Sequence, residues 1–306
     1  AHDVVHHGVN RLVAQCIDVD AAHIAVHSDH LRQARGQVQI GSLVFDAERQ
    51  QLGNVHGSLD RLVRLANIMT TITDNLQQVR DRIAQASVAA GRDPASVSLL
   101  AVSKTFGPEA VLQAAQAGQR AFGENYLQEA VEKMAALRQM GAPALQWHCI
   151  GPVQSNKTRL VAEHFDWMHT VDRPRIAERL AAQRPAHLAP LQVCIQINVD
   201  GGLAKSGVAP EDALALAQTV AALPQLCLRG VMSIPEPAAD YAAQHALHQR
   251  ARAVFDRIRT SGLPGLEHFD TLSLGMTADL DAAIAAGSTL VRVGTGIFGG
   301  RTRPAG

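Results

Sequence analysis

The sequence predicts an α/β fold in which eight parallel strands alternate with helices and close into a single (β/α)8 TIM barrel. First, short apolar segments alternate with amphipathic segments from residue 98 to residue 293. Second, eight such units within about 238 residues match the size of a closed barrel. Third, the turn after the first strand carries a lysine, where an open doubly wound sheet would carry a glycine-rich loop.

The regular part of the chain begins with a predicted helix. Its apolar residues recur at helical spacing and are Ile72, Leu76, Val79, Ile83 and Ala86. Gly91 and Pro94 end this helix. The next segment, 98–104, is apolar without alternation, which is typical of a strand buried on both faces. Gly107 and Pro108 then open the following helix.

The remaining elements follow from the same signals. Short apolar segments predict strands over residues 98–104, 121–123, 146–150, 167–171, 191–198, 226–233, 271–274 and 290–293. Helical periodicity predicts helices over residues 108–117, 126–140, 156–163, 173–184, 210–223, 238–260 and 277–286. Gly118 and Gly141 stand at helix ends, where a left-handed residue is common. Each strand except the last is therefore followed by a helix.

The composition indicates a large hydrophobic core and a formal net charge near zero. The chain has 306 residues, of which 47% are hydrophobic, and its formal net charge is +0. We therefore expect no nucleic-acid or membrane partner, since there is no basic field and no apolar run long enough for a span. The four cysteines form no CxxC pair, which favours reduced thiols and a cytoplasmic location. We expect the protein to be a monomer.

Residues 1–68 differ from the rest of the chain. They contain no proline, lysine or methionine, yet they hold seven of the fourteen histidines. Such a tract is able to bind metal, but its spacings contain no closed ligand set, so we expect no metal site. We expect 1–68 to be an irregular extension with at most a short helix over 59–68, or an artefact of a mis-set start. The native chain would then begin at Met69, and 69–306 would form the barrel. The intact mass of the protein made from its own gene would show whether residues 1–68 are part of the native chain or an artefact of a mis-set start.

Lys104 stands where the first buried strand ends. An ammonium there must find a counter-charge, lose its proton or be consumed in a covalent bond, because burial disfavours its charged form. The last alternative would make Lys104 an amine that traps a carbonyl compound. The competing interpretation is that Lys104 is an ordinary lysine whose ammonium reaches solvent. The chain contains only four lysines, Lys104, Lys133, Lys157 and Lys205.

Polar and small residues follow the predicted strands at the end where a barrel of this kind carries its active site. The candidate cofactor-binding residues are Lys104, Asn125, Met232, Ser273, Gly275, Met276, Thr277, Arg292, Gly294 and Thr295. None of them is assigned a catalytic role. They predict one binding site at the barrel mouth.

The residues after the last two strands are typical of a phosphate site. Gly294, Thr295 and Gly296 offer a flexible backbone and a hydroxyl, and Thr277 is expected to begin a helix whose free N–H groups favour an anion. Arg292 would pair with the phosphate, hydrogen-bond a ring nitrogen, or be an interior arginine held by a carboxylate. A reactive lysine beside a phosphate site suggests pyridoxal 5'-phosphate (PLP) held as a Schiff base. A Schiff-base aldolase acting on a sugar phosphate remains equally open.

Longer motifs carry a resemblance to a known family. They are AVSKTF, FGENYLQEA, WHCIGPVQSNK, HTVDRPRIAERL, QINVDGGLAKSG, LRGVMSIP and LSLGMTADLDAAIAAGSTLVRVGTGIFGGR. From about Thr71 to Arg301 the chain resembles the pyridoxal phosphate homeostasis protein family, which is similar to the N-terminal barrel of alanine racemase. The resemblance implies a fold-type III PLP-binding barrel without the C-terminal β domain of alanine racemase.

The resemblance also implies roles for single residues. Lys104 would hold PLP as an internal aldimine, and Arg292 would lie near the pyridine ring or the phosphate. Asn125 and Met232 would lie near the ring. The residues implied around the phosphate are Ser273, Gly275, Thr277, Gly294 and Thr295. Thr277 stands where serine is common in the family, and it keeps the hydroxyl.

Two functions compete at this stage. The resemblance implies a protein that binds, stores or delivers PLP and influences amino-acid and keto-acid balance, with apo PLP-dependent enzymes as candidate recipients. The alternative is a PLP-dependent amino-acid racemase, which needs two bases on opposite faces of the ring, commonly a lysine and a tyrosine. The chain has only Tyr126 and Tyr241, and neither stands at the racemase tyrosine position. We therefore expect a non-catalytic cofactor carrier.

Further polar residues have less specific interpretations. His148 is expected at the mouth as a ring or substrate contact, with His169 as another acid or base candidate. Cys149 should point to the opposite face of its strand, into packing. Lys157 and Lys205 are expected to be solvated rather than transient cofactor acceptors. The residues expected on a solvated helix face are Glu129, Glu132 and Lys133.

Overall fold

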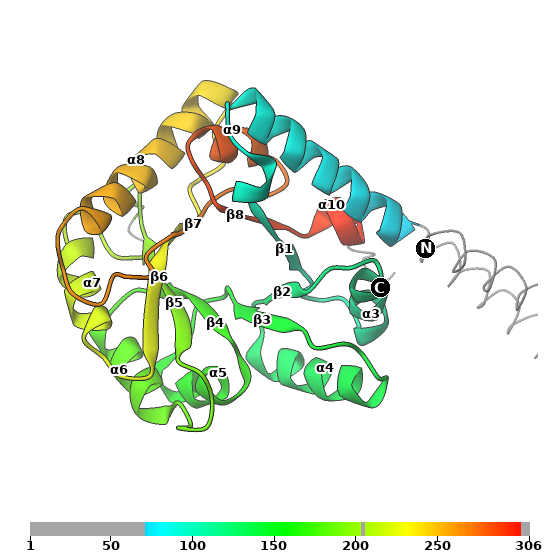
Figure 1. The fold of residues 1–306 in the computed structure, drawn as a ribbon, viewed down its shortest axis with the longest axis horizontal. Coiled ribbons are helices and arrows are strands. Elements are labelled where there is room, and N and C mark those ends of the chain that lie inside the picture. Colours follow the sequence, from blue (N-terminus) through cyan, green and yellow to red (C-terminus); the bar gives the residue numbers. More distant parts are fainter. Residues whose placement is uncertain (1–70, 203–205, 301–306) are drawn as a thin grey trace, which may run out of the picture. The chain divides into compact units, whose positions relative to one another are not determined.

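The computed structural model describes residues 71–202 and 206–300, in which eight parallel strands close into a barrel in chain order (Figure 1). The predicted TIM barrel is confirmed. The strands are β1 (Ser98–Val102), β2 (Ala121–Glu124), β3 (Gln146–Cys149), β4 (Trp167–Val171), β5 (Leu191–Ile197), β6 (Leu226–Ser233), β7 (Thr271–Ser273) and β8 (Leu290–Val293). The predictions for 1–68 and for Lys205 lie outside the described residues.

Helices surround the ring of strands (Figure 1). The described part opens with a helix over residues 71–89. The labelled helices are α3 (Pro108–Gln116), α4 (Leu127–Gln139), α5 (Thr158–His164), α6 (Pro174–Gln183), α7 (Ala213–Ala221), α8 (Tyr241–Arg259), α9 (Leu280–Ala285) and α10 (Thr295–Phe298). Two 3-10 turns, η1 (Pro94–Ser96) and η2 (Ser155–Lys157), lie between them. Among the described residues, no helix is both long enough and apolar enough to cross a bilayer.

The structure corrects two predicted elements at the end of the chain. The helix predicted from Thr277 begins at Leu280, and Thr277 lies in the turn before it. Asp279 explains the difference, because its Oδ1 accepts a hydrogen bond from the N–H of Met276 at 2.6 Å and so holds a turn ahead of α9. The second difference is that a short helix, α10, follows β8, where the sequence predicted none.

The helix over residues 71–89 covers the outside of the barrel next to α9 and α10, where Figure 1 draws it in cyan. The buried members of its predicted apolar face are Ile72, Leu76, Val79 and Ile83. Asn75 Nδ2 donates to the carbonyl of Ile297 at 3.0 Å. Arg82 donates to the carbonyl of Thr277 at 2.7 Å and pairs with Asp281 at the same distance. These bonds fix the helix against the loops that follow β7 and β8.

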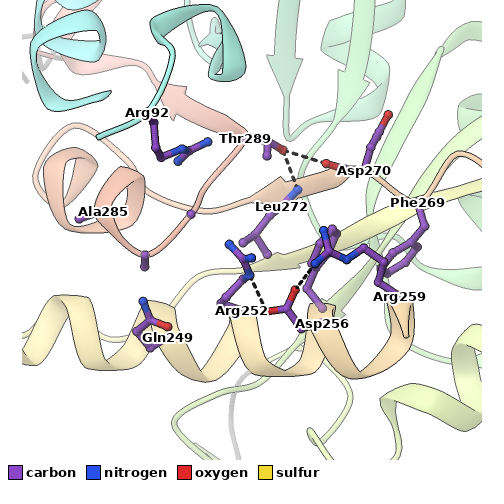
Figure 2. Close-up of a pocket in the computed structure, with 13 residues that line it drawn as sticks. Arg92, Gln249, Arg252, Asp256, Arg259, Phe269, Asp270, Leu272, Ala285 and Thr289 are labelled. Atoms are coloured by element: carbon purple, nitrogen blue, oxygen red, sulfur yellow. Dashed lines mark hydrogen bonds and ion pairs between the residues drawn. The ribbon is translucent and has the colours of Figure 1, made fainter. Parts of the chain in front are cut away.

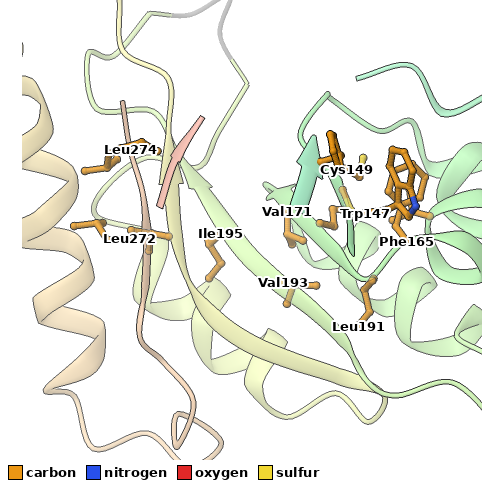
Figure 3. Close-up of a cluster of buried hydrophobic side chains, with 14 of the residues drawn as sticks. Trp147, Cys149, Phe165, Val171, Leu191, Val193, Ile195, Leu272 and Leu274 are labelled. Carbon is orange, nitrogen blue, oxygen red and sulfur yellow. The ribbon is translucent and has the colours of Figure 1, made fainter. Parts of the chain in front are cut away.

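Apolar side chains fill the shell between the strands and the helices (Figure 3). Cys149 and Val193 belong to this shell, so the outward direction predicted for Cys149 is confirmed. Each fully buried aliphatic side chain contributes about 1.5–3 kcal/mol, so the shell is a main source of the barrel's stability. Smaller clusters fill the barrel interior, one of them formed by Leu100, Val102, Ile150 and Leu290.

Candidate functional site

Lys104 lies just beyond the C-terminal end of β1. Along β1 the side chains alternate: Val102 belongs to the interior cluster and Ala101 to the outer shell. Ser103 continues the alternation outward, and its hydroxyl donates to Glu124 at 2.7 Å. The next position, Lys104, lies in the turn after β1 and is partly buried, at the end of the barrel where the strands terminate.

Arg292 on β8 is a buried cation inside the barrel, with an exposed fraction of 3%. Its guanidinium donates to the carbonyl and the hydroxyl of Ser273 at 2.6 and 2.8 Å, and to the carbonyl of Ser233 at 2.9 Å. Burial lowers the pKa of Arg292 to about 10, so it stays protonated at neutral pH. Among the described residues it is held by serine oxygens, not by the carboxylate that one of the sequence interpretations required.

A chain of hydrogen bonds crosses the barrel interior below Arg292. The distances are 3.0 Å from Ser273 Oγ to His169 Nδ1, 2.9 Å from His169 Nε2 to His148 Nδ1, and 3.0 Å from His148 Nε2 to Gln146 Oε1. Arg292 can only donate a hydrogen bond and the Gln146 oxygen can only accept one. These two ends therefore fix which atom donates in each hydrogen bond between them. Ser273 donates to His169, which donates to His148, and both imidazoles are neutral.

The two histidines are therefore parts of the barrel interior. Burial lowers the pKa of His148 to about 3, and burial with the neighbouring His148 and Arg292 lowers that of His169 well below its usual value. His148 is 1% exposed and has both ring nitrogens hydrogen-bonded. The prediction that His148 is a ring or substrate contact at the mouth is wrong, because its strand position turns it into the interior network. Cys149 is no nucleophile either, since burial raises the pKa of its thiol to about 12.

The loops after β7 and β8 meet at two threonines. Thr295 Oγ1 donates to Thr277 Oγ1 at 3.3 Å, so the two hydroxyls predicted at the phosphate are neighbours. Gly275 has a φ of +86°, which glycine adopts without strain. A Cβ on Gly294 would come within 3.1 Å of a β1 carbonyl, so glycine allows β8 to end close to β1. Ser273 lies deeper, where its hydroxyl is committed to Arg292 and His169, and supports the arginine.

Among the described residues, two of the buried polar atoms that lack a hydrogen-bond partner belong to residues near the site, at or just after the end of a strand. They are Oδ1 of Asn125, after β2, and Oγ of Ser233, the last residue of β6. Such atoms are rare in folded proteins and mark a place for a ligand or water. The predicted site omitted Ser233, although its position at a strand end was a signal. Of the two predicted methionines, Met232 is buried and Met276 is 40% exposed.

Comparisons with known proteins identify the family. The family described as alanine racemase, N-terminal domain, matches residues 71–302. The pyridoxal phosphate homeostasis protein of Pseudomonas aeruginosa is 55% identical over 233 residues, which cover 76% of this chain and 97% of the relative. The Escherichia coli protein of the same name is 52% identical over 233 residues, covering 76% and 98%. This chain belongs to the pyridoxal phosphate homeostasis protein family.

A solved structure supports the same assignment. PipY of Synechococcus elongatus, determined with PLP bound, is 37% identical and superposes with a TM-score of 0.64. The match covers 74% of this chain and 100% of that protein. The resemblance inferred from the motifs is thus confirmed for the family and for the fold.

In this member of the homeostasis protein family, the helix face predicted to be solvated is partly buried. The Lys133 side chain is 3% exposed and pairs with Glu124 at 2.7 Å and with Glu129 at 3.1 Å, whereas Glu132 is exposed as predicted. The prediction for Lys133 is therefore wrong. The missed signal was helical spacing, because the buried residues of α4 are Ala130, Lys133, Met134 and Leu137.

A separate hollow of about 680 Å³ lies on the outside of the barrel, against α8 and the β7 and β8 strand starts (Figure 2). Three arginines line it, and each makes hydrogen bonds within the protein. Arg92 donates to the carbonyls of Ile284 and Ser288 at 2.8 Å. Arg252 and Arg259 both bond to Asp256. Among the described residues, none of the buried polar atoms without a partner belongs to the lining of this hollow, in contrast to the barrel mouth.

Proposed function

We propose that this chain binds PLP as a Schiff base on Lys104 and acts as a non-catalytic carrier in intracellular PLP homeostasis and supply, and in amino-acid and keto-acid balance. The observation that carries the proposal is a pair of groups in one barrel. A partly buried lysine follows β1, and a buried arginine on β8 is held by neutral oxygens among the described residues. An amine captures an aldehyde, and an arginine is a permanent cation for an anionic ligand.

The residues at the mouth fit a phosphorylated pyridine aldehyde. Asn125 Oδ1 and Ser233 Oγ are buried polar atoms that a ligand's ring substituents would satisfy. The hydroxyls of Thr277 and Thr295, together with the N–H groups that open α10, suit a phosphate. The relative PipY, solved with PLP bound, supports this choice of ligand.

Bound PLP supplies an aldehyde that condenses reversibly with a primary amine. Lys104 would supply that amine through Nζ, and the condensation would form a C=N bond in place of the C=O bond, with the oxygen lost as water. Arg292 keeps a positive charge in the barrel, and the two serines fix the direction of its guanidinium. Addition of water returns the free amine and the aldehyde, so the same bond allows release to an apo-enzyme.

The side chains around the site favour a carrier over a racemase. A racemase would need a second base opposite the lysine. Tyr126 and Tyr241 are 54% and 56% exposed. His148 and His169 have both ring nitrogens hydrogen-bonded inside the barrel. None of these four groups is held as a buried base at the mouth.

Borohydride trapping tests the lysine. The purified protein should be yellow with PLP, and reduction should fix the cofactor on the peptide that contains Lys104. Lys104→Ala should lose the yellow band, and Lys157→Ala, which removes an exposed lysine, should keep it. An unchanged spectrum of Lys104→Ala would refute the assignment.

Hydrogen exchange at Cα tests the carrier role against the racemase. We expect negligible exchange of the Cα proton of alanine in deuterium oxide. Transfer of the bound cofactor to an apo-enzyme should be faster than its release into buffer. Exchange at ordinary enzymatic rates would support the racemase instead.

A further inference from the structure

The peptide units on both sides of Lys104 are tied to the same helix, α4. On one side, the Lys133 ammonium donates to the carbonyl of Ser103 at 2.9 Å. On the other, the N–H of Thr105 donates to Glu129 Oε1 at 3.1 Å. Lys133 and Glu129 are one helical turn apart and also pair with each other. The bonds therefore bracket Lys104 from the outer face of the barrel.

The ion cluster that makes these contacts is well buried at its centre. Lys133 and Glu124 have side chains that are 3% and 0% exposed, and their charged atoms are 2.7 Å apart. Glu124 Oε1 also accepts from the Ser103 hydroxyl at 2.7 Å. Burial raises the pKa of Glu124, and the Lys133 ammonium and the Ser103 hydroxyl act in the opposite direction. Water cannot replace these bonds easily, so the Ser103 carbonyl is held firmly.

The turn held in this way is strained. The N–H of Phe106 donates to the carbonyl of Ser103 at 3.1 Å, which closes a four-residue β-turn with Lys104 as its second residue. The third residue, Thr105, has a φ of +69°. Glycine or asparagine normally stands there, and a β-branched residue in this region is strained. The bond to Glu129 offsets part of that strain.

We propose that Lys133, Glu124 and Glu129 form a positioning cluster that holds the Ser103–Phe106 turn in its strained conformation and thereby aims the amine of Lys104 into the barrel. The proposal rests on the proposed function, because the amine is useful there only if it captures an aldehyde. Without the cluster, the turn relaxes toward negative φ, and the lysine samples directions that do not face the site. The cluster touches neither the ligand nor the reacting atoms, and it acts through the backbone.

The test compares two glutamates on one helix in the full-length protein. Glu129→Ala removes the acceptor of the Thr105 N–H, and Glu132→Ala removes an exposed charge about one turn along α4 from Glu129, where its carboxylate accepts from Gln128. We expect the rate at which the yellow band forms on mixing with PLP to fall about tenfold in Glu129→Ala, the size of one lost charge-assisted hydrogen bond. Glu132→Ala should react like the parent protein.

A rescue separates positioning from a general effect on folding. Thr105→Gly allows a φ of +69° without strain, so it should restore most of the lost rate in the Glu129→Ala background. General damage to α4 would not respond to this change. Equal rates for Glu129→Ala and Glu132→Ala, or no rescue by Thr105→Gly, would overturn the proposal.

The proposed function and the positioning cluster fail in different ways. If borohydride fixes no cofactor on Lys104 in the parent protein, the proposed function fails. If it does, and Glu129→Ala still reacts at the parental rate, only the positioning role fails. Urea unfolding of each variant shows whether a slow rate reflects loss of the fold.

Discussion

Two of the buried cations among the described residues, Lys133 and Arg292, are held in opposite ways. On the outer face of β1 and β2, Lys133 lies against the carboxylates of Glu124 and Glu129. Inside the barrel, Arg292 is held by oxygens of Ser233 and Ser273, which carry no formal charge. The first charge is neutralised within the protein and shapes the backbone. The second is not neutralised by its direct partners, so it remains available to a ligand.

We expect the largest loss of stability when the paired cation, Lys133, is replaced. Lys133→Met leaves Glu124 buried without its partner, so we expect the free energy of unfolding to fall by about 3–5 kcal/mol in urea titrations. Adding Glu124→Gln removes the stranded charge, and the double variant should be the more stable of the two. A double variant less stable than Lys133→Met would contradict the pairing.

We expect a smaller loss of stability when Arg292, which is not directly paired with a carboxylate, is replaced. Arg292→Met leaves no buried countercharge behind, only serine acceptors, so the loss of unfolding free energy should be about 1–3 kcal/mol. The affinity for PLP should fall as well, measured by equilibrium dialysis. A loss larger than that of Lys133→Met would show that the two cations are not held as differently as the geometry indicates.

The histidines below Arg292 make stability depend on pH. The native pKa of His148 is about 3, below its unfolded value, so the native state binds fewer protons. The stability that the neutral ring contributes is fully present above pH 6.5 and is lost as the pH falls toward 3, by about 1.4 kcal/mol per pH unit. Urea unfolding between pH 7 and 5 measures the slope. His148→Phe should reduce it; an unchanged slope would mean that His148 does not titrate this way.

The smallest stability effect is expected at the mouth itself. The Ser233 hydroxyl is buried and has no hydrogen-bond partner in the part of the chain that the structure describes, so Ser233→Ala should change the free energy of unfolding by less than about 1 kcal/mol. The affinity for PLP should nevertheless drop, because the ligand would lose a hydrogen bond. Thermal unfolding with and without PLP measures both. An affinity equal to that of the parent protein would remove Ser233 from the site.

Much of the fold was predictable from local patterns. The strands at 167–171, 226–233 and 290–293 have the predicted bounds, because short apolar runs between turn residues leave little choice. The short helix after β8 was missed because its four residues carry no periodic signal. Thr277 was misassigned to a helix because the turn held by Asp279 depends on one side-chain bond.

The candidate site was predictable as a set of positions, less so as a set of contacts. The meeting of Thr277 and Thr295 followed from the rule that consecutive strand ends are neighbours in a barrel. The burial of Lys133 was missed although its helical spacing with Met134 and Leu137 indicated it, because an i, i+4 pair of charges by itself looks the same whether it faces solvent or a strand. The Arg292 bond to Ser233 joins residues 59 positions apart.

The sequence by itself determined the succession of strands and helices, the family, and the place of Lys104 at the end of the first strand. These depend on periodicity and on contiguous motifs, which are local properties of the chain. Only the tertiary structure decided which side chains meet. Closing the barrel sets the register between strands, and a shift of one residue would turn each side chain to the other face. That register puts His148, His169 and Arg292 inside, and puts the carboxylate of Glu124 outside against Lys133.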